Sequence, residues 1–271
     1  MRIKVRHATS YSYTRPVEYE AQALRLAPRN HAGQRILSWR VTDAEGRALP
    51  ATDDGYGNIV HLLTIVRSHR AAGVIAEGEV ETIDTHGVVR EAPETLPISY
   101  WQRATVATTT DQALRALANG IGDSGDAIER LHRLMTRVRE RVDYMIGQTD
   151  VTTTAAQALE RGKGVCQDHA HVFIACARTL GFPARYVSGY LWTSDQALAA
   201  EAGHAWAEAY VPSLGWVGFD AANNLCPTEA YVRVAVGLDY GEAAPVRGVR
   251  RGVAEEALVV AVDVLSSQAQ Q

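Results

Sequence analysis

The amino-acid sequence predicts an α+β fold in which a small β-sandwich precedes a core built from a helix packed against an antiparallel sheet. Three observations predict this arrangement. Apolar and polar residues alternate near the N-terminus, an almost wholly apolar helix follows Cys166, and two short segments typical of strands are joined around "PSL" after His204. The expected parts are a sandwich of residues 1–90, a linker of residues 91–107 and a catalytic part of residues 108–271.

The N-terminal part has the period and turn chemistry of an all-β region. One parity of its first segment carries Ile3, Val5, His7, Thr9, Tyr11 and Tyr13, as expected for a strand with one buried face. The segments "RILSWRV" and "NIVHLLTIV" then flank a turn-rich connection. The following "EAPETLPISYWQRATVA" has two prolines and no clean period, which indicates a linker.

Composition excludes several classes of protein. The chain has 271 residues, a formal net charge of −4 and 46% hydrophobic residues, so neither nucleic acid nor an anionic membrane is expected as a partner. No apolar run approaches the length of a membrane span, and the N-terminus lacks the apolar stretch of a signal peptide. The chain has three cysteines, Cys166, Cys176 and Cys226. They form no disulfide framework, which predicts a cytoplasmic protein.

Cys166 stands at the expected start of the apolar helix, behind a tight turn that contains Gly162 and Gly164. The unpaired N–H groups and the positive dipole end of that helix stabilise negative charge on sulfur. A lone cysteine is otherwise a small buried hydrophobe, and this is the role expected for Cys176. Cys166 is therefore the candidate nucleophile, because it lies on the first turn of the helix.

A thiolate nucleophile needs a base, and the base needs an acceptor that orients it. In "GHAWAEAYV", strand alternation places His204 and Trp206 on one face and small alanines on the other. If "PSL" is a three-residue hairpin loop, Trp206 pairs with Asp220, and His204 lies diagonally beside Asp220. An even number of loop residues would send Asp220 to the opposite face.

Zinc ligation is the competing hypothesis for these residues. Cys166 and His169 are three residues apart on one helix face, and His171 and His204 could join them. However, His171 points away from Cys166 on a helix, and the chain has no Cys-x-x-Cys or His-Glu-x-x-His spacing. We therefore expect neither a metal nor a cofactor.

Two long segments, "GVCQDHAHVFIACARTLGFPARYVSGY" and "HAWAEAYVPSLGWVGFDAANN", resemble the core of the bacterial transglutaminase-like cysteine protease superfamily. The N-terminal β region is similar to the β-rich domain of one bacterial subfamily, and "VAVGLDYGEAAPVRG" to the C-terminal segment of that subfamily. The resemblance implies a papain-like arrangement with Cys166 as nucleophile, His204 as general base and Asp220 as the residue that orients it. Family members usually have proline and threonine after this aspartate, whereas Ala221 and Ala222 follow here, so the shape of this loop is in question.

The expected function is that of a cysteine-nucleophile enzyme that acts on peptide or isopeptide bonds through an acyl-enzyme, with water as the favoured acceptor. Acyl transfer to an amine and a non-catalytic peptide-binding module are the alternatives. Peptide N-glycanases and arylamine N-acetyltransferases share the same Cys–His–Asp order. A peptide or protein substrate is expected, and the candidate substrate-binding residues are Tyr190, Trp192 and Trp206.

Overall fold

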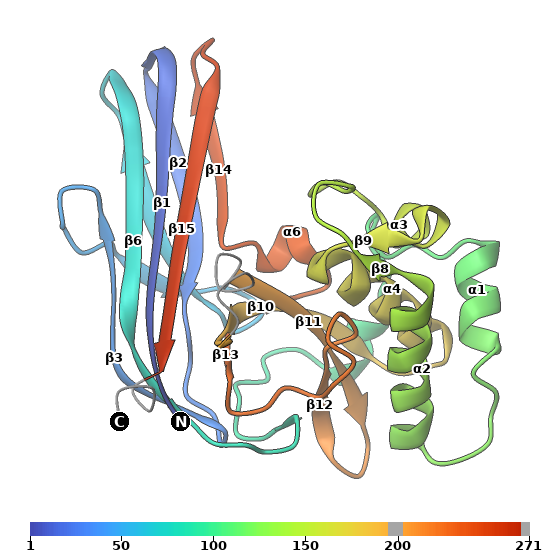
Figure 1. The fold of residues 1–271 in the computed structure, drawn as a ribbon. Coiled ribbons are helices and arrows are strands. Elements are labelled where there is room, and N and C mark those ends of the chain that lie inside the picture. The colour runs from blue at the N-terminus through green and yellow to red at the C-terminus, as the bar shows by residue number, and fades with distance from the viewer. Residues whose placement is uncertain (195–202, 267–271) are drawn as a thin grey trace.

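The structure is a computed structural model that describes residues 1–194 and 203–266. It has two parts that lie side by side, a tall β-sandwich and a core covered by helices (Figure 1). This arrangement confirms the predicted α+β class.

The sandwich consists of two four-stranded sheets with the strand orders β15-β1-β6-β3 and β14-β2-β5-β4. Its strands are β1 (Arg2–Val17), β2 (Tyr19–Ala27), β3 (Gln34–Asp43), β4 (Ala51–Asp53), β5 (Ile59–Ile65), β6 (His69–Thr82), β14 (Val246–Arg251) and β15 (Glu256–Ser266). The alternation along β1 is real, since Ile3, Val5 and His7 are buried while their neighbours Lys4 and Arg6 are exposed.

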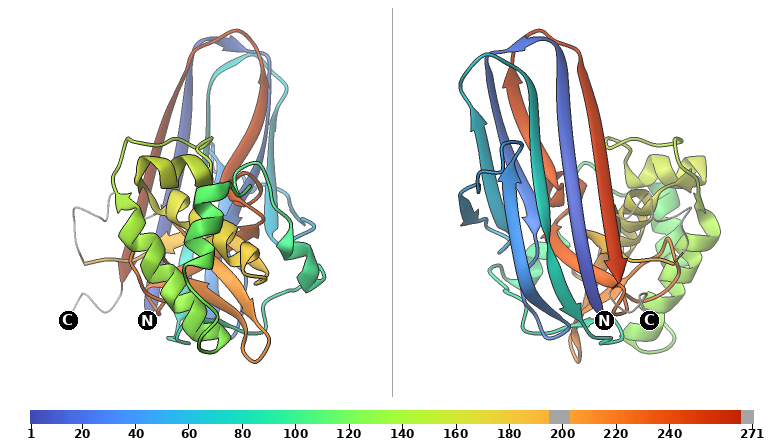
Figure 2. Two further views of the ribbon diagram at one scale, coloured as in Figure 1. Left: turned by 90° about the vertical axis from the view of Figure 1, so that its right-hand side faces the viewer. Right: turned by 60° about the vertical axis from the view of Figure 1, so that its left-hand side comes forward.

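Both ends of the chain build the sandwich. Strand β15 pairs antiparallel with β1, so that Ile3 lies opposite Ser266 and Tyr13 opposite Glu256 (Figure 2). Strand β14 pairs with β2 in the other sheet. The range 108–271 expected for the catalytic part thus includes two strands of the sandwich, because pairing between distant segments leaves no local signal in the sequence.

The expected linker, residues 91–107, is folded against the core. It contains the 3-10 helix η1 (Ile98–Gln102), in which Trp101 is buried and meets the ring of Trp216 edge to face with centroids 5.8 Å apart. Glu94 accepts hydrogen bonds from the indole nitrogen of Trp216 at 2.6 Å and from Arg185 at 3.0 Å. These contacts fix the segment against the core sheet rather than leaving it as a free connection.

The core contains a five-stranded antiparallel sheet with the order β13-β10-β11-β12-β7. Its strands are β7 (Val88–Val89), β10 (Ala184–Leu191), β11 (Gly203–Val211), β12 (Gly215–Phe219) and β13 (Tyr231–Gly237). A parallel pair of two-residue strands, β8 (Asp143–Tyr144) and β9 (Lys163–Gly164), lies beside the helices.

Helix α4 (Cys166–Thr179) is the centre of the core. It packs on β11 and contacts the other long helices, which are α1 (Gln112–Asn119), α2 (Ala127–Arg141) and α3 (Ala155–Arg161). Eleven residues of α4 are buried, as its apolar sequence predicted. Alanines at 205, 207 and 209 in β11 belong to the same apolar cluster as the α4 side chains, so the small-residue face of the strand accepts the helix.

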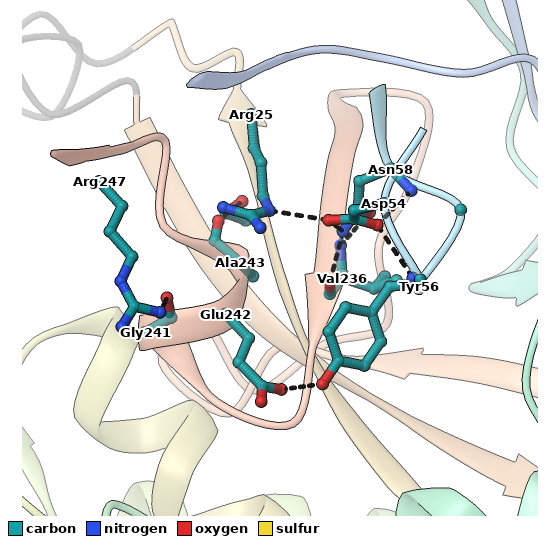
Figure 3. Close-up of polar contacts among 12 residues, drawn as sticks. Arg25, Asp54, Tyr56, Asn58, Val236, Gly241, Glu242, Ala243 and Arg247 are labelled. Atoms are coloured by element: carbon teal, nitrogen blue, oxygen red, sulfur yellow. Dashed lines mark hydrogen bonds and ion pairs between the residues drawn. The ribbon is translucent and has the colours of Figure 1, made fainter. Parts of the chain in front are cut away.

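The loop between β4 and β5 of the sandwich bonds to the edge strand β13 of the core sheet. The Asp54 carboxylate accepts hydrogen bonds from the N–H groups of Tyr56 and Asn58 and so shapes the turn. The Asn58 side chain then bonds both backbone polar groups of Val236, each at 2.8 Å, and the Tyr56 hydroxyl donates to Glu242 at 2.5 Å (Figure 3). These bonds tie the sandwich to β13 and to the short helix α6 (Tyr240–Ala243).

Candidate active site

Cys166 is the first residue of α4, where the sequence predicted it. The Asp168 carboxylate caps this end of the helix, since it accepts the Val165 N–H at 2.8 Å and the Thr149 hydroxyl at 2.6 Å. A Cβ atom at Gly164 would lie 2.6 Å from the Cβ of Asp168, so only glycine fits beside this cap. The glycine turn and the capping carboxylate together place Cys166 at the helix N-terminus.

His204 and Asp220 meet through the β11–β12 hairpin. Val211 pairs with Gly215, which leaves a three-residue loop and confirms the odd count on which the sequence argument depended. In this register Asp220 lies diagonally across from His204, and its Oδ2 is 2.7 Å from the Nε2 of His204. Two side chains separated by fifteen residues in the sequence are thereby brought into direct contact.

The Asp220 carboxylate is fully buried, and hydrogen-bond donors surround it. Besides His204, its Oδ2 accepts the Tyr231 hydroxyl and the Asn223 side-chain amide, each at 2.7 Å, and its Oδ1 accepts the N–H groups of Ala222 and Asn223. Burial alone would raise the pKa of Asp220, but the charge of His204 and these donors hold it below its usual value. Asp220 is therefore an ionised acceptor at neutral pH.

Tyr231 is the residue of this site that the sequence did not reveal. It begins β13, which lies two strands away from β11 in the sheet order. Its ring stands at 61° to that of His204, with centroids 5.9 Å apart, and its hydroxyl reaches Asp220. No local pattern around Tyr231 signals this contact, because it depends on how distant strands are ordered in the sheet.

His204 lies between Asp220 and Cys166. Burial would lower its pKa, but the Asp220 carboxylate, the Cys166 side chain and the hydrogen bonds to both residues raise it to about 10. Because Nε2 contacts Asp220, Nδ1 is the ring nitrogen left for Cys166. A cysteine and a histidine in contact are the pair that nucleophilic catalysis by sulfur requires.

Cys166 and His204 open onto a cleft of about 360 Å³. Its core wall includes Gln167 of α4 and the side chains of Tyr186, Ser188 and Tyr190 on β10. Its opposite wall comes largely from strands β1 and β15 of the sandwich. The cleft therefore lies at the junction of the two parts, and neither part forms it alone.

The three candidate substrate-binding residues occupy different places. Tyr190 lines the cleft. Trp206 is buried behind His204, with the two rings at 27° and their centroids 6.3 Å apart, so it supports the histidine and does not face the cleft. Trp192 packs against the apolar cluster of β1, β6 and β13 between the sandwich and the core.

The histidines of α4 have structural partners. The two ring nitrogens of His169 lie 2.9 Å and 2.8 Å from the carbonyl oxygens of Val165 and Val142. The Nε2 of His171 accepts the Tyr240 N–H at 3.1 Å and so joins α4 to α6. Within residues 1–194 and 203–266, no group of three or more His, Cys, Asp or Glu side chains is placed to hold a metal ion.

No helix in the described part of the chain is long and apolar enough to cross a membrane.

Comparison with known sequences identifies the family to which this fold belongs. Residues 115–221 match the family model described as the transglutaminase-like superfamily, and residues 3–81 match the bacterial transglutaminase-like N-terminal region. The chain belongs to the transglutaminase-like superfamily.

The similarity to known proteins extends over nearly the whole chain. An uncharacterized protein of Mycobacterium bovis is 30% identical and covers 97% of this chain and 92% of its own length. A second uncharacterized protein, from Mycobacterium leprae, is 28% identical, with 97% and 98% of the two chains covered. The crystal structure of a candidate cysteine protease from Cytophaga hutchinsonii has the same fold, with a TM-score of 0.77, 22% identity and coverage of 98% of this chain and 91% of that one.

Proposed function

We propose that this protein is a cysteine-nucleophile hydrolase that cleaves peptide or isopeptide bonds through an acyl-enzyme. One observation carries the proposal: a cysteine at a helix N-terminus and a histidine oriented by a buried carboxylate open onto one cleft. The fold shared with a candidate cysteine protease supports the same chemical class.

In the first step, the Cys166 thiolate attacks the substrate carbonyl carbon and forms a C–S bond. The negative charge then moves to the carbonyl oxygen. The Cys166 backbone N–H belongs to the first helical turn, where N–H groups have no partner within the helix, and we assign it as a donor to that oxygen. The His204 proton passes to the amine nitrogen as the C–N bond breaks, and this leaves a thioester on Cys166.

In the second step, neutral His204 removes a proton from water, and the resulting hydroxide attacks the thioester carbon. The C–S bond breaks, the acid leaves, and the thiolate and imidazolium return. Asp220 keeps the imidazole in one orientation throughout, because its Oδ2 accepts from Nε2. A primary amine in place of water would give acyl transfer instead.

The proposal is tested by incubating the purified protein with a peptide library, with and without a primary amine, and by identifying products by mass spectrometry. We expect hydrolysis products in both samples and none from Cys166→Ala, whereas Cys176→Ala and Cys226→Ala should retain activity. Products that carry the amine, without hydrolysis, would assign the protein as a transferase. No product under any condition would favour a peptide-binding module.

We also propose that the protein works in the cytoplasm, without nucleic acid or a membrane as partner. All three cysteines are free, which suits a reducing compartment, and the net charge of −4 does not favour polyanions. Fractionation of the native cells and detection with an antibody test this location, and recovery outside the cytoplasm would contradict it.

A further inference from the structure

One sheet face of the sandwich forms a wall of the cleft at Cys166. The side chains that reach the cleft from β1 and β15 are His7, Thr9, Tyr11, Leu258, Val260 and Val262. They are cross-strand partners, since His7 lies opposite Val262, Thr9 opposite Val260 and Tyr11 opposite Leu258. Because side chains alternate along a strand, all of them project from the same face of the sheet.

Val262 packs against the apolar cluster between the sandwich and the core, but the two apolar residues nearer the start of β15 lack such cover. Ile3 and Val5, farther along β1 on the same face, are buried in the cluster between the sandwich and the core. Leu258 and Val260 are each 51% exposed. Exposed apolar side chains grouped inside a cleft mark a surface that binds an apolar group.

The wall is electrically neutral where it meets the cleft. His7 is uncharged at neutral pH, since burial lowers its pKa to about 4, and its ring nitrogens lie 3.1 Å from the hydroxyls of Tyr190 and Thr9. Apart from the histidines, Arg25 is the charged side chain among the described residues of the cleft, and its Nε donates to Asp54 at 2.9 Å (Figure 3). An acidic or basic substrate side chain would find no free counter-charge on the β1–β15 face.

We infer that the β1–β15 wall binds an apolar side chain of an extended peptide, next to the bond that Cys166 attacks. The inference rests on the proposed function for the reaction itself. A cleft of about 360 Å³ is near the lower end of the usual range of ligand sites, so it holds only a short stretch of substrate. Strand β15 is the edge of its sheet, and the backbone of an edge strand can pair with an extended peptide.

A matched pair of variants on β15 isolates this wall. Val260→Lys places a charge on the face that lines the cleft. Val259→Lys places the same charge one residue away, on the opposite face of the strand, where Val259 is 64% exposed. Both positions are open to water, so the two variants should fold equally well, and circular dichroism and thermal unfolding check this.

Binding is measured without turnover in a Cys166→Ala background. A randomised decapeptide library is equilibrated with Cys166→Ala, Cys166→Ala/Val260→Lys and Cys166→Ala/Val259→Lys, and the bound peptides are sequenced by mass spectrometry. We expect the first and third proteins to enrich peptides with an apolar residue at one fixed position. With Cys166→Ala/Val260→Lys, this enrichment should fall at least about tenfold, and acidic residues should replace the apolar residues at that position.

Equal enrichment by all three proteins, or enrichment by none, would overturn the inference. Loss of binding together with a dimer that only Val260→Lys dissociates in sedimentation would assign the wall to a second copy and also overturn it. Cleavage is measured separately, with the protein that retains Cys166. Selective binding without cleavage would reject the proposed reaction and keep the apolar subsite, whereas cleavage without selectivity would reject the subsite alone.

Discussion

At the scale of single residues, Asp220 shows how a buried carboxylate is kept ionised. It has no exposed surface, so its charge depends on His204, Tyr231, Asn223 and two backbone N–H groups. In the proposed mechanism, Asp220 orients His204 through the contact between Oδ2 and Nε2.

The variant Asp220→Asn keeps the shape of the side chain and removes its charge. We expect kcat to fall by about 10²–10⁴, because the amide no longer holds the imidazole in the orientation that catalysis needs. Asp220→Ala should lose at least as much. Steady-state kinetics on a cleavable peptide measures both, and wild-type kcat in folded Asp220→Asn would contradict this role.

The pKa of His204 gives a second prediction at this scale. NMR titration should find a value near 10 in the wild type and lower values in Asp220→Asn and Cys166→Ala, since each change removes a negative charge that raises it. Because the folded-state pKa lies above the ordinary value of 6.5, ionised His204 stabilises the fold most below pH 6.5, and this contribution is lost as the pH rises through about 10. A histidine that titrates at 6.5 in all three proteins would contradict the ion pair.

Among the elements, the turn from α3 into α4 sets the position of Cys166. Gly162 ends α3 in the left-handed region, with φ +62°, and Gly164 leaves room for the Asp168 cap. The cap in turn fixes the first turn of α4, where Cys166 begins the helix.

Gly164→Ala should therefore disturb both stability and activity. Its methyl group would overlap the Asp168 side chain, and such overpacking costs about 1–3 kcal/mol in the free energy of unfolding. The matched control is Gly55→Ala, because a Cβ there meets nothing within 4 Å. Denaturant unfolding and kcat/KM measure the effects, and equal behaviour of the two variants would refute the close approach at Gly164.

The elements also show which features the sequence could predict. Alternation in β11, together with the odd loop, was enough to bring His204 to Asp220, because both depend on local spacing. The apolar stretch after Cys166 was enough to predict a buried helix. Trp206 was placed on the correct face of its strand, but the sequence could not show that Tyr231 covers that face with its ring 5.4 Å away.

At the scale of the whole molecule, the two chain ends determine the architecture. Strands β14 and β15 complete the sandwich from the C-terminal side, and β15 also lines the cleft at Cys166. The order of the sequence alone assigns both strands to the expected catalytic part, because only tertiary pairing places them beside β1 and β2.

This topology predicts that the N-terminal fragment 1–107 does not fold alone. Without β14 and β15, it exposes the β1 and β2 edges and the apolar face that packs on the core. We expect the fragment to give a poorly dispersed NMR spectrum and the whole chain to unfold in one cooperative transition. A well-dispersed spectrum of the fragment would show that the sandwich does not need the C-terminal strands.

The reactivity of the three cysteines tests whether Cys166 is the nucleophile of a Cys–His–Asp site. Burial raises the pKa of Cys176 to about 12 and that of Cys226 to about 11, whereas Cys166 lies beside charged His204. The native protein is treated with iodoacetamide at pH 7, and the alkylation of each cysteine is followed by mass spectrometry. We expect Cys166 to react far faster than the other two, and His204→Ala to remove most of that advantage. If Cys166 reacts no faster than Cys226, or if His204→Ala leaves its rate unchanged, Cys166 is not the nucleophile of a Cys–His–Asp site.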